Sequence, residues 1–310
     1  MSANVESMFF VRETPWYGLG IKVEEAVDST SALSLAGLDW KVEQMPVYTG
    51  DRKLIPGYKA NVRDRDGKVL GVVTDRYKVV QNAEAFAFTD ELLGRGVRYE
   101  TAGSLQAGRR VWILARLPRE YIITGEQITP YLIFSNSHDG SGAIKAALTP
   151  IRVVCQNTLN LALDTAKRTW SMIHTGDIRS KLREAEESLF LAEKYMASLG
   201  AEIENLQRKK LTDKQVLGFM EELLPLEAGA AVQQKKNVEK LRKDMERRYF
   251  DAPDLQHVGK NAYRFINAVS DFATHARPLR KTANHKENLF ARTIDGNALI
   301  DRAYQMVKAA

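Results

Sequence analysis

Short stretches of alternating apolar and polar positions dominate the first 170 residues, a pattern typical of half-buried β-strands. The clearest example covers residues 58–62, a polar turn at 64–68, and residues 69–74. Because an Asp-Gly pair supplies the positive φ that a tight turn needs, this segment is predicted to form a β-hairpin. Two further hairpins are predicted around turns at residues 106–108 and 138–142.

A period of three to four residues marks the predicted helices. Asn82 is expected to cap the first of them, which stops before Gly94. After Trp170 this pattern prevails, and helices are predicted over residues 178–206, 212–224, 237–249, 259–276 and 296–310. Thr212 with Gln215 three positions on is the pattern of a capping box.

Strand-rich segments followed by helix-rich segments predict an α+β fold. The expected architecture is a set of N-terminal antiparallel β-hairpins with packed helices, followed by a mostly helical C-terminal region. We place a β-rich domain at residues 1–172 and a helical, basic region at residues 173–310.

Composition narrows the class of protein. A chain of 310 residues with 44% hydrophobic and 27% charged residues has an ordinary globular composition. No apolar run is long enough for a membrane helix, and the N-terminus has no secretory signal pattern, so we expect a cytoplasmic protein with no membrane partner. The single cysteine, Cys155, excludes an internal disulfide framework and a multi-cysteine metal site.

The positive charge of the chain is concentrated near its C-terminus. Residues 1–239 hold 31 basic and 31 acidic side chains, whereas residues 240–310 hold 14 and 8, which accounts for the net charge of +6. An excess in one region is typical of a surface that meets an anionic partner, although a solvated helical surface explains it equally well. The cations concerned include Lys240, Arg242, Lys243, Arg247, Arg248, Lys260, Arg264, Arg277, Arg280 and Lys281.

Motifs for nucleotide or metal chemistry are missing from the sequence. Gly140-Ser141-Gly142 has neither the third glycine nor the Gly-Lys-Ser/Thr of a phosphate-binding loop, so an NTPase is rejected. The five histidines are scattered without metal-ligand spacing. We therefore expect no cofactor and no metal, and assign no catalytic residue.

Cations close to aromatic residues form the candidate nucleic-acid site. In single-strand binding, cations follow the phosphates and ring faces stack on bases. The predicted contacts are Arg76, Tyr77, Lys78, Arg109, Arg110, Trp112, Lys145 and Arg152, with Tyr77 or Trp112 stacking. The alternative for each is an ordinary surface cation or a core aromatic residue.

An enzyme is the alternative class of function. Polar side chains gather where the third hairpin leads into a helix, namely Asn136, His138, Asp139, Arg152, Cys155, Gln156 and Asn157. Cys155 would begin that helix, where thiol pKa values are lowered, but a lone cysteine in an apolar run is usually buried and inert. Turn and capping chemistry explains the other side chains without a substrate.

Several segments carry a family resemblance. They are Ser135–Ser141, Thr149–Leu159, Leu70–Val73, Arg76–Asn82, Gly103 with Gly108–Trp112, and Trp16–Gly20. Together they resemble the phage- and plasmid-like proteins known as domain of unknown function 932. The resemblance covers most of the first 170 residues, and the helical remainder is expected to vary. It implies carriage on a phage, prophage or plasmid, and no established reaction.

Hairpins followed by packed helices are also broadly similar to the single-strand annealing proteins of phage recombination systems, which oligomerise and hold single strands in a basic groove. The leading hypothesis is therefore a non-enzymatic DNA-binding protein of a mobile element, a homo-oligomer that binds or anneals single strands during replication or recombination.

Overall fold

The computed structural model divides the chain into two compact units that interleave along the sequence. It describes residues 5–11, 21–25, 27–93, 98–117, 121–152, 157–158, 169–176, 180, 192–277, 279 and 297–310. Unit 1 comprises residues 1–119, 131–148 and 168–192, and unit 2 comprises residues 120–130, 149–167 and 193–310. Residues 193–310, which hold most of the predicted helical region, lie in unit 2. The boundary expected after residue 172 stays a prediction.

A nine-stranded sheet has the order β11-β10-β9-β7-β6-β1-β2, with β12 paired to β10 and β8 paired to β9. Its strands are β1 (Val5–Val11), β2 (Ile21–Val23), β6 (Arg98–Leu105), β7 (Arg110–Arg116), β8 (Tyr121–Ile123), β9 (Glu126–Ser137), β10 (Ile144–Arg152), β11 (Asn157–Thr158) and β12 (Thr169–Met172). The second and third predicted hairpins are confirmed, since β6 pairs with β7 and β9 neighbours β10.

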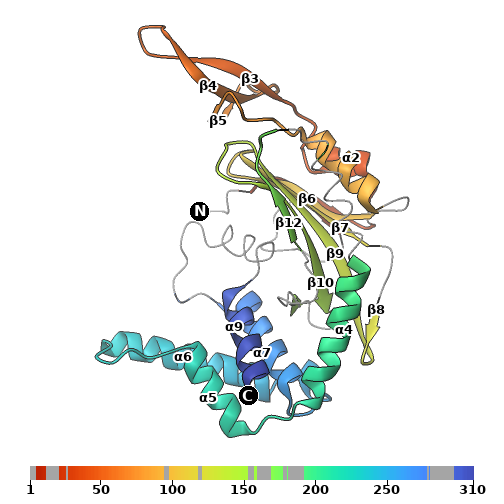
Figure 1. Cartoon of the computed structure of the whole chain (residues 1–310), viewed down its shortest axis with the longest axis vertical. Helices are drawn as coiled ribbons and strands as arrows, with labels where there is room; N and C mark the ends of the chain where they lie inside the picture. Colours follow the sequence, from red (N-terminus) through yellow and green to blue (C-terminus); the bar gives the residue numbers. More distant parts are fainter. Residues whose placement is uncertain are drawn as a thin grey trace. The chain divides into compact units, whose positions relative to one another are not determined.

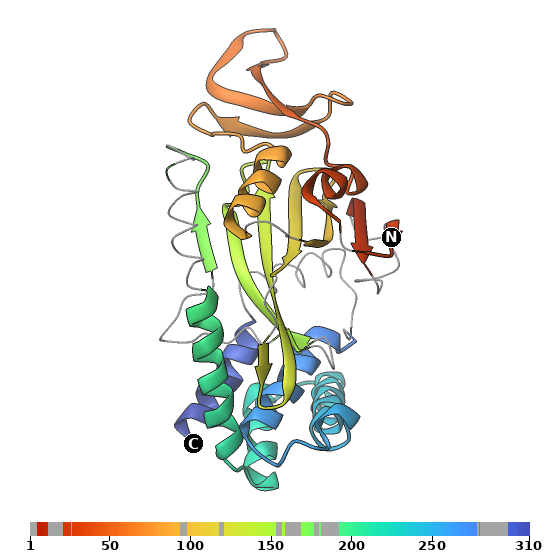
Figure 2. The ribbon, with the colours of Figure 1, turned by 90° about the vertical axis from the view of Figure 1, so that its right-hand side faces the viewer.

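One face of this sheet forms the core of unit 1. Phe9, Ala102, Ile113 and Phe134 lie side by side across β1, β6, β7 and β9, and all belong to one buried apolar cluster. Helices α1 (Ser29–Leu35) and α2 (Asn82–Leu93) pack on the sheet; α2 is the orange helix in front of the strands in Figure 2. The β6–β7 hairpin, β9, β10 and α2 all contribute apolar side chains to this core.

The opposite face of the sheet is buried as well. Met8, Trp112 and Ile133 alternate with the core residues along their strands, yet each is buried. Gly103 lies between them, and a Cβ there would fall 2.4 Å from the carbonyl oxygen of Ser7. Only glycine permits this close approach of β1 to β6.

A separate three-stranded sheet has the order β3-β4-β5 (Figure 1). Its strands are β3 (Val42–Tyr48), β4 (Leu54–Arg63) and β5 (Val69–Thr74). The first predicted hairpin is confirmed: β4 pairs with β5, and Gly67 in the turn has φ of 68°. This sheet belongs to unit 1.

Unit 2 contains the β8–β9 hairpin and a group of helices. Residues Thr124 and Gly125 turn the hairpin with φ of 52° and 83°, and Gln207 of α4 donates a hydrogen bond to the Thr124 hydroxyl (2.9 Å). The helices are α4 (Ala192–Arg208), α5 (Asp213–Leu223), α6 (Val232–Phe250), α7 (Ala262–His275) and α9 (Ala298–Ala309), with a 3₁₀ turn at Pro253–Leu255. The Thr212–Gln215 capping box is confirmed. The α+β class is thus confirmed.

A buried arginine closes the end of α6. Arg264 donates hydrogen bonds to the carbonyls of Tyr249 (2.8 Å), Phe250 (3.2 Å) and Val258 (3.0 Å). The last carbonyls of a helix have no partner within the helix, so a buried guanidinium satisfies them.

No helix in the described part of the chain is long and apolar enough to cross a membrane.

Candidate nucleic-acid interface

A buried polar junction joins the turn between β9 and β10 to the three-stranded sheet and to α2, all within unit 1. Asn61 of β4 donates to the carbonyl of His138 (2.7 Å), and the His138 backbone N–H donates to the carbonyl of Arg109 (2.7 Å). Asn136 donates to the carbonyl of Val80 (2.9 Å). These bonds hold the β9–β10 turn, the β6–β7 turn and the segment after β5 at one place.

His138 is a fully buried, neutral member of this junction. Its Nε2 lies 3.0 Å from Oδ1 of Asn82, and Asn82 uses its own amide N–H to donate to the Leu38 carbonyl (3.0 Å). Nε2 of His138 is therefore the donor. Burial lowers the pKa of His138 to about 3. The expectation that Asn82 caps α2 is wrong, because its side chain is committed to this junction.

Neutral burial of His138 predicts a pH-dependent stability. In the unfolded chain a histidine has a pKa near 6.5, so between pH 6.5 and about 3 the unfolded state holds the extra proton. The free energy of unfolding should fall by roughly 1.4 kcal/mol per pH unit below 6.5. Urea unfolding at pH 7 and pH 5 should show a smaller difference for His138→Gln than for the wild type. The exposed control His275→Gln should retain the wild-type difference, and equal differences in all three proteins would contradict this assignment.

The loop after β5 is fixed to the segment after β12. Tyr77 stacks on His174 with ring centroids 4.4 Å apart, and its hydroxyl donates to the Ser137 carbonyl. The Lys78 N–H donates to the His174 carbonyl (2.7 Å), and the His174 ring donates through Nδ1 to the Lys78 carbonyl (2.9 Å). Burial lowers the pKa of His174 and raises the pKa of Tyr77. The backbone at Arg76–Lys78 is therefore held against the end of β9.

Four of the predicted cations surround this junction, and we call them the cation cluster: Arg76, Lys78, Arg109 and Arg110. Arg76, Lys78 and Arg109 are exposed and Arg110 is half-buried. The backbones of Lys78, Arg109 and Arg110 are bonded to His174, His138 and Ser137 in that order. Arg76 directly precedes Tyr77, whose hydroxyl donates to the Ser137 carbonyl. None of the four side chains forms an ion pair with any residue in the described ranges. The structure thus gathers cations that are 33 positions apart between Arg76 and Arg109.

Asp139 is the acidic residue of the β9–β10 turn, and it interacts with Arg110 of the cluster. Partial burial raises the pKa of its carboxyl, but hydrogen bonds from the Ser137 hydroxyl (2.6 Å) and the Ser141 N–H (2.9 Å) outweigh that effect, with help from Arg110, so the pKa is lowered. Asp139 is thus an ionised turn residue bonded to its own loop.

The aromatic residues expected to stack on bases are not on the surface. Trp112 is 3% exposed and Tyr77 is 7% exposed. The alternation Val111, Ile113, Ala115 indicates only one apolar face for β7, but both faces of the sheet are covered, so Trp112 lies inside. In this structure neither ring offers a free face to a base.

The two remaining predicted contacts are on β10. Lys145 is half-buried at the second position of β10, where its strand partner is Ser171 of β12. Arg152 is the last residue of β10, and its side chain lies outside the described part. The alternative enzyme site is similarly divided: Asn136 and His138 are fully buried, Asn157 is in β11, and Cys155 and Gln156 lie outside the described residues. Among the described residues no group of His, Cys, Asp or Glu could hold a metal ion.

Several basic residues near the C-terminus serve the packing of unit 2. Arg248 pairs with Asp271 (2.5 Å), Lys260 pairs with Asp213 (2.7 Å), and Arg264 is buried. Arg242 donates to the Leu224 carbonyl (3.0 Å). Part of the basic charge that the sequence shows there is used in contacts within unit 2, whereas Lys236, Lys240 and Lys243 of α6 are exposed.

The fold and the site together define an α+β protein with a cation cluster beside a buried polar junction. The chain belongs to the family described as domain of unknown function (DUF932), whose profile matches residues 69–294. This confirms the resemblance seen in the sequence and extends it through the helical region, while β3 and β4 precede the match. Comparison with curated proteins and with solved structures gives no match.

Proposed function

We propose that this protein is a DNA-binding protein of a phage or plasmid, and that it binds single strands through the cation cluster. The observation that carries the proposal is that Arg76, Lys78, Arg109 and Arg110 come from two distant segments, surround one rigid junction, and have no ion-pair partner in the described part of the chain. Arg76, Lys78 and Arg109 form no ion pair with a described residue and keep their charge available for phosphates, whereas Arg110 also interacts with Asp139.

The rigidity of the junction supports this role. Hydrogen bonds of Asn61, Tyr77 and His138 hold the backbone segments that carry the cation cluster. Binding therefore does not require those segments to become ordered. Long, flexible side chains on a fixed backbone suit a polyanion whose sequence is not read. We further propose that the protein assembles as a homo-oligomer in the host cytoplasm and anneals strands in replication or recombination.

Among the described residues, nothing in the geometry favours the enzyme alternative. His138, its best candidate base, is fully buried, and its donor nitrogen is engaged by Asn82. A general base must come within hydrogen-bond reach of the proton that it removes. The polar corner at β9–β10 is accounted for as the junction that positions the cations.

The double variant Arg76→Gln/Arg109→Gln tests the proposal. Filter binding of a labelled single-stranded oligonucleotide at two salt concentrations should show weaker binding than the wild type, with the slope of log K against log salt less steep by about 1.4, or 0.7 for each lost contact. Arg208→Gln, an exposed cation of α4 in unit 2, is the matched control and should bind like the wild type. Equal binding by the wild type and the double variant would contradict the assigned site.

A further inference from the structure

The three-stranded sheet has an exposed apolar face. Six of the thirteen exposed large hydrophobic residues in the described part of the chain belong to it: Met45, Tyr48, Leu54, Tyr58, Val69 and Val72. Cross-strand pairing places Met45, Ala60 and Val72 in one row and Tyr58 beside Thr74 in another, two positions away along β4. Met45, Tyr58 and Val72 therefore share a face. The other face carries Asn61 and turns toward the buried junction.

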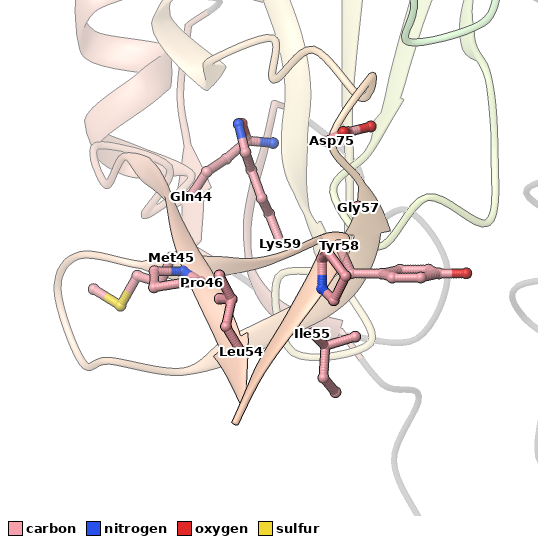
Figure 3. Close-up of a pocket in the computed structure, with 10 residues that line it drawn as sticks. Gln44, Met45, Pro46, Leu54, Ile55, Gly57, Tyr58, Lys59 and Asp75 are labelled. Atoms are coloured by element: carbon pink, nitrogen blue, oxygen red, sulfur yellow. The ribbon is translucent and has the colours of Figure 1, made fainter. Parts of the chain in front are cut away.

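An exposed apolar face on a sheet is a candidate binding surface. Exposed apolar residues scattered singly are normal, but a contiguous set indicates a binding site. A hollow of about 270 Å³ lies beside it, lined by Met45, Leu54, Ile55 and Tyr58 together with the polar residues Gln44, Lys59 and Asp75. That volume is below the roughly 300–1,000 Å³ typical of small-molecule pockets. Figure 3 shows the Tyr58 ring projecting away from the other labelled side chains.

The chemistry around this face indicates the partner. Residues 42–78 hold eight basic and five acidic side chains, an excess of three basic groups, whereas the rest of residues 1–239 holds an excess of three acidic groups. The face is also joined to the cation cluster, because the N–H of Asp75 donates to the carbonyl of Gly57 (3.0 Å). Asp75 directly precedes Arg76, and Gly57 directly precedes Tyr58. The bond therefore holds the backbones of Arg76 and Tyr58 close to each other.

We infer that this face is a base-stacking platform for single-stranded nucleic acid, with Tyr58 as its principal stacking side chain. The inference rests on the proposed function: phosphates contact the cation cluster while the unpaired bases lie on the sheet. Tyr58 is 50% exposed and Tyr48 is 55% exposed, so both rings are accessible, unlike Tyr77 and Trp112. Every base has a π-face, so such a platform tolerates any sequence, and it selects single strands because duplex bases are already stacked.

The test compares Tyr58→Ala with Tyr58→Phe, which keeps the ring, using a single-stranded oligonucleotide and its duplex. Tyr58→Ala should weaken single-strand binding about tenfold, whereas Tyr58→Phe should stay within about twofold of the wild type. Duplex affinity should not change in either variant. An oligonucleotide carrying 5-iododeoxyuridine should photo-crosslink to the peptide that contains Tyr58, a readout on the unaltered protein.

Other outcomes overturn the inference. If Tyr58→Ala binds single strands as well as the wild type while Arg76→Gln/Arg109→Gln binds weakly, the platform is refuted and the proposed function stands. If the wild type binds no oligonucleotide, both are refuted. If Tyr58→Ala reduces the mass of the particle in solution, the face is an interface between copies of this chain and the stacking role is refuted.

Discussion

Replacing Gly71 with alanine is expected to destabilise the protein by about 3 kcal/mol. A Cβ on Gly71 would lie 2.6 Å from Cα and 2.9 Å from the carbonyl oxygen of Asp139. Both are backbone atoms of the β9–β10 turn, so no flexible side chain can move aside. The added methyl group must push β5 away from that turn, and with it the backbone that places Arg76 and Lys78 beside the junction.

Two measurements separate the displacement of β5 from a general effect of replacing glycine with alanine. Urea unfolding should show the loss of stability for Gly71→Ala, and single-strand binding should weaken even where the variant remains folded. Gly50→Ala is the matched control, because nothing lies within 4 Å of its Cβ position and its φ is not in the left-handed region. An alanine tolerated equally at both positions would show that β5 and the turn are not in contact.

Replacing Arg63 with methionine is also expected to cost about 3 kcal/mol. The guanidinium is 2% exposed, donates to both carboxylate oxygens of Glu6 (2.7 and 2.8 Å) and to Asp66 (2.9 and 2.6 Å), and lies over the Trp40 ring. Methionine keeps much of the volume but leaves two carboxylates without their counter-ion.

A double-mutant cycle with Glu6→Gln measures the coupling. The cost of Arg63→Met should be smaller in the Glu6→Gln background, because one unpaired charge has been removed. Hydrogen bonds from Arg63 lower the pKa of Glu6 and bring that of Asp66 to about 2. Stability from these carboxylates is therefore present above pH 4.5 and lost as the pH falls through the lowered values. If the losses of stability from the two substitutions are additive, and stability falls at acidic pH as it does in the wild type, the ion pairs contribute nothing to stability.

Local patterns were sufficient to predict much of the fold. The hairpin turn at residues 64–68 and the Thr212–Gln215 capping box depend on near neighbours in the chain, so their residue types reveal them. The pairing of β1 with β6 joins residues about 90 positions apart, and no local pattern encodes such a register. The same limit applies to Trp112, whose burial depends on what covers the second face of the sheet.

The candidate site was likewise predictable only in part. The sequence was sufficient to identify the cations. The structure adds that the segments containing Arg76 and Arg109 both contact the buried junction. Asn61 and Asn82 were missed because asparagine in a strand or at a helix start is read as a turn or cap, and only the fold brings both to His138. Tyr58 was assigned only to a strand, although its alternation with Lys59 and Asn61 placed it on a separate face.

Titration of the wild-type protein with a fluorescent single-stranded oligonucleotide between 50 and 200 mM salt tests the central claim most directly. Four phosphate contacts from Arg76, Lys78, Arg109 and Arg110 predict a plot of log K against log salt with a slope of about −2.8. A slope near zero, or no binding at the lowest salt, would contradict the assignment of these side chains to a polynucleotide.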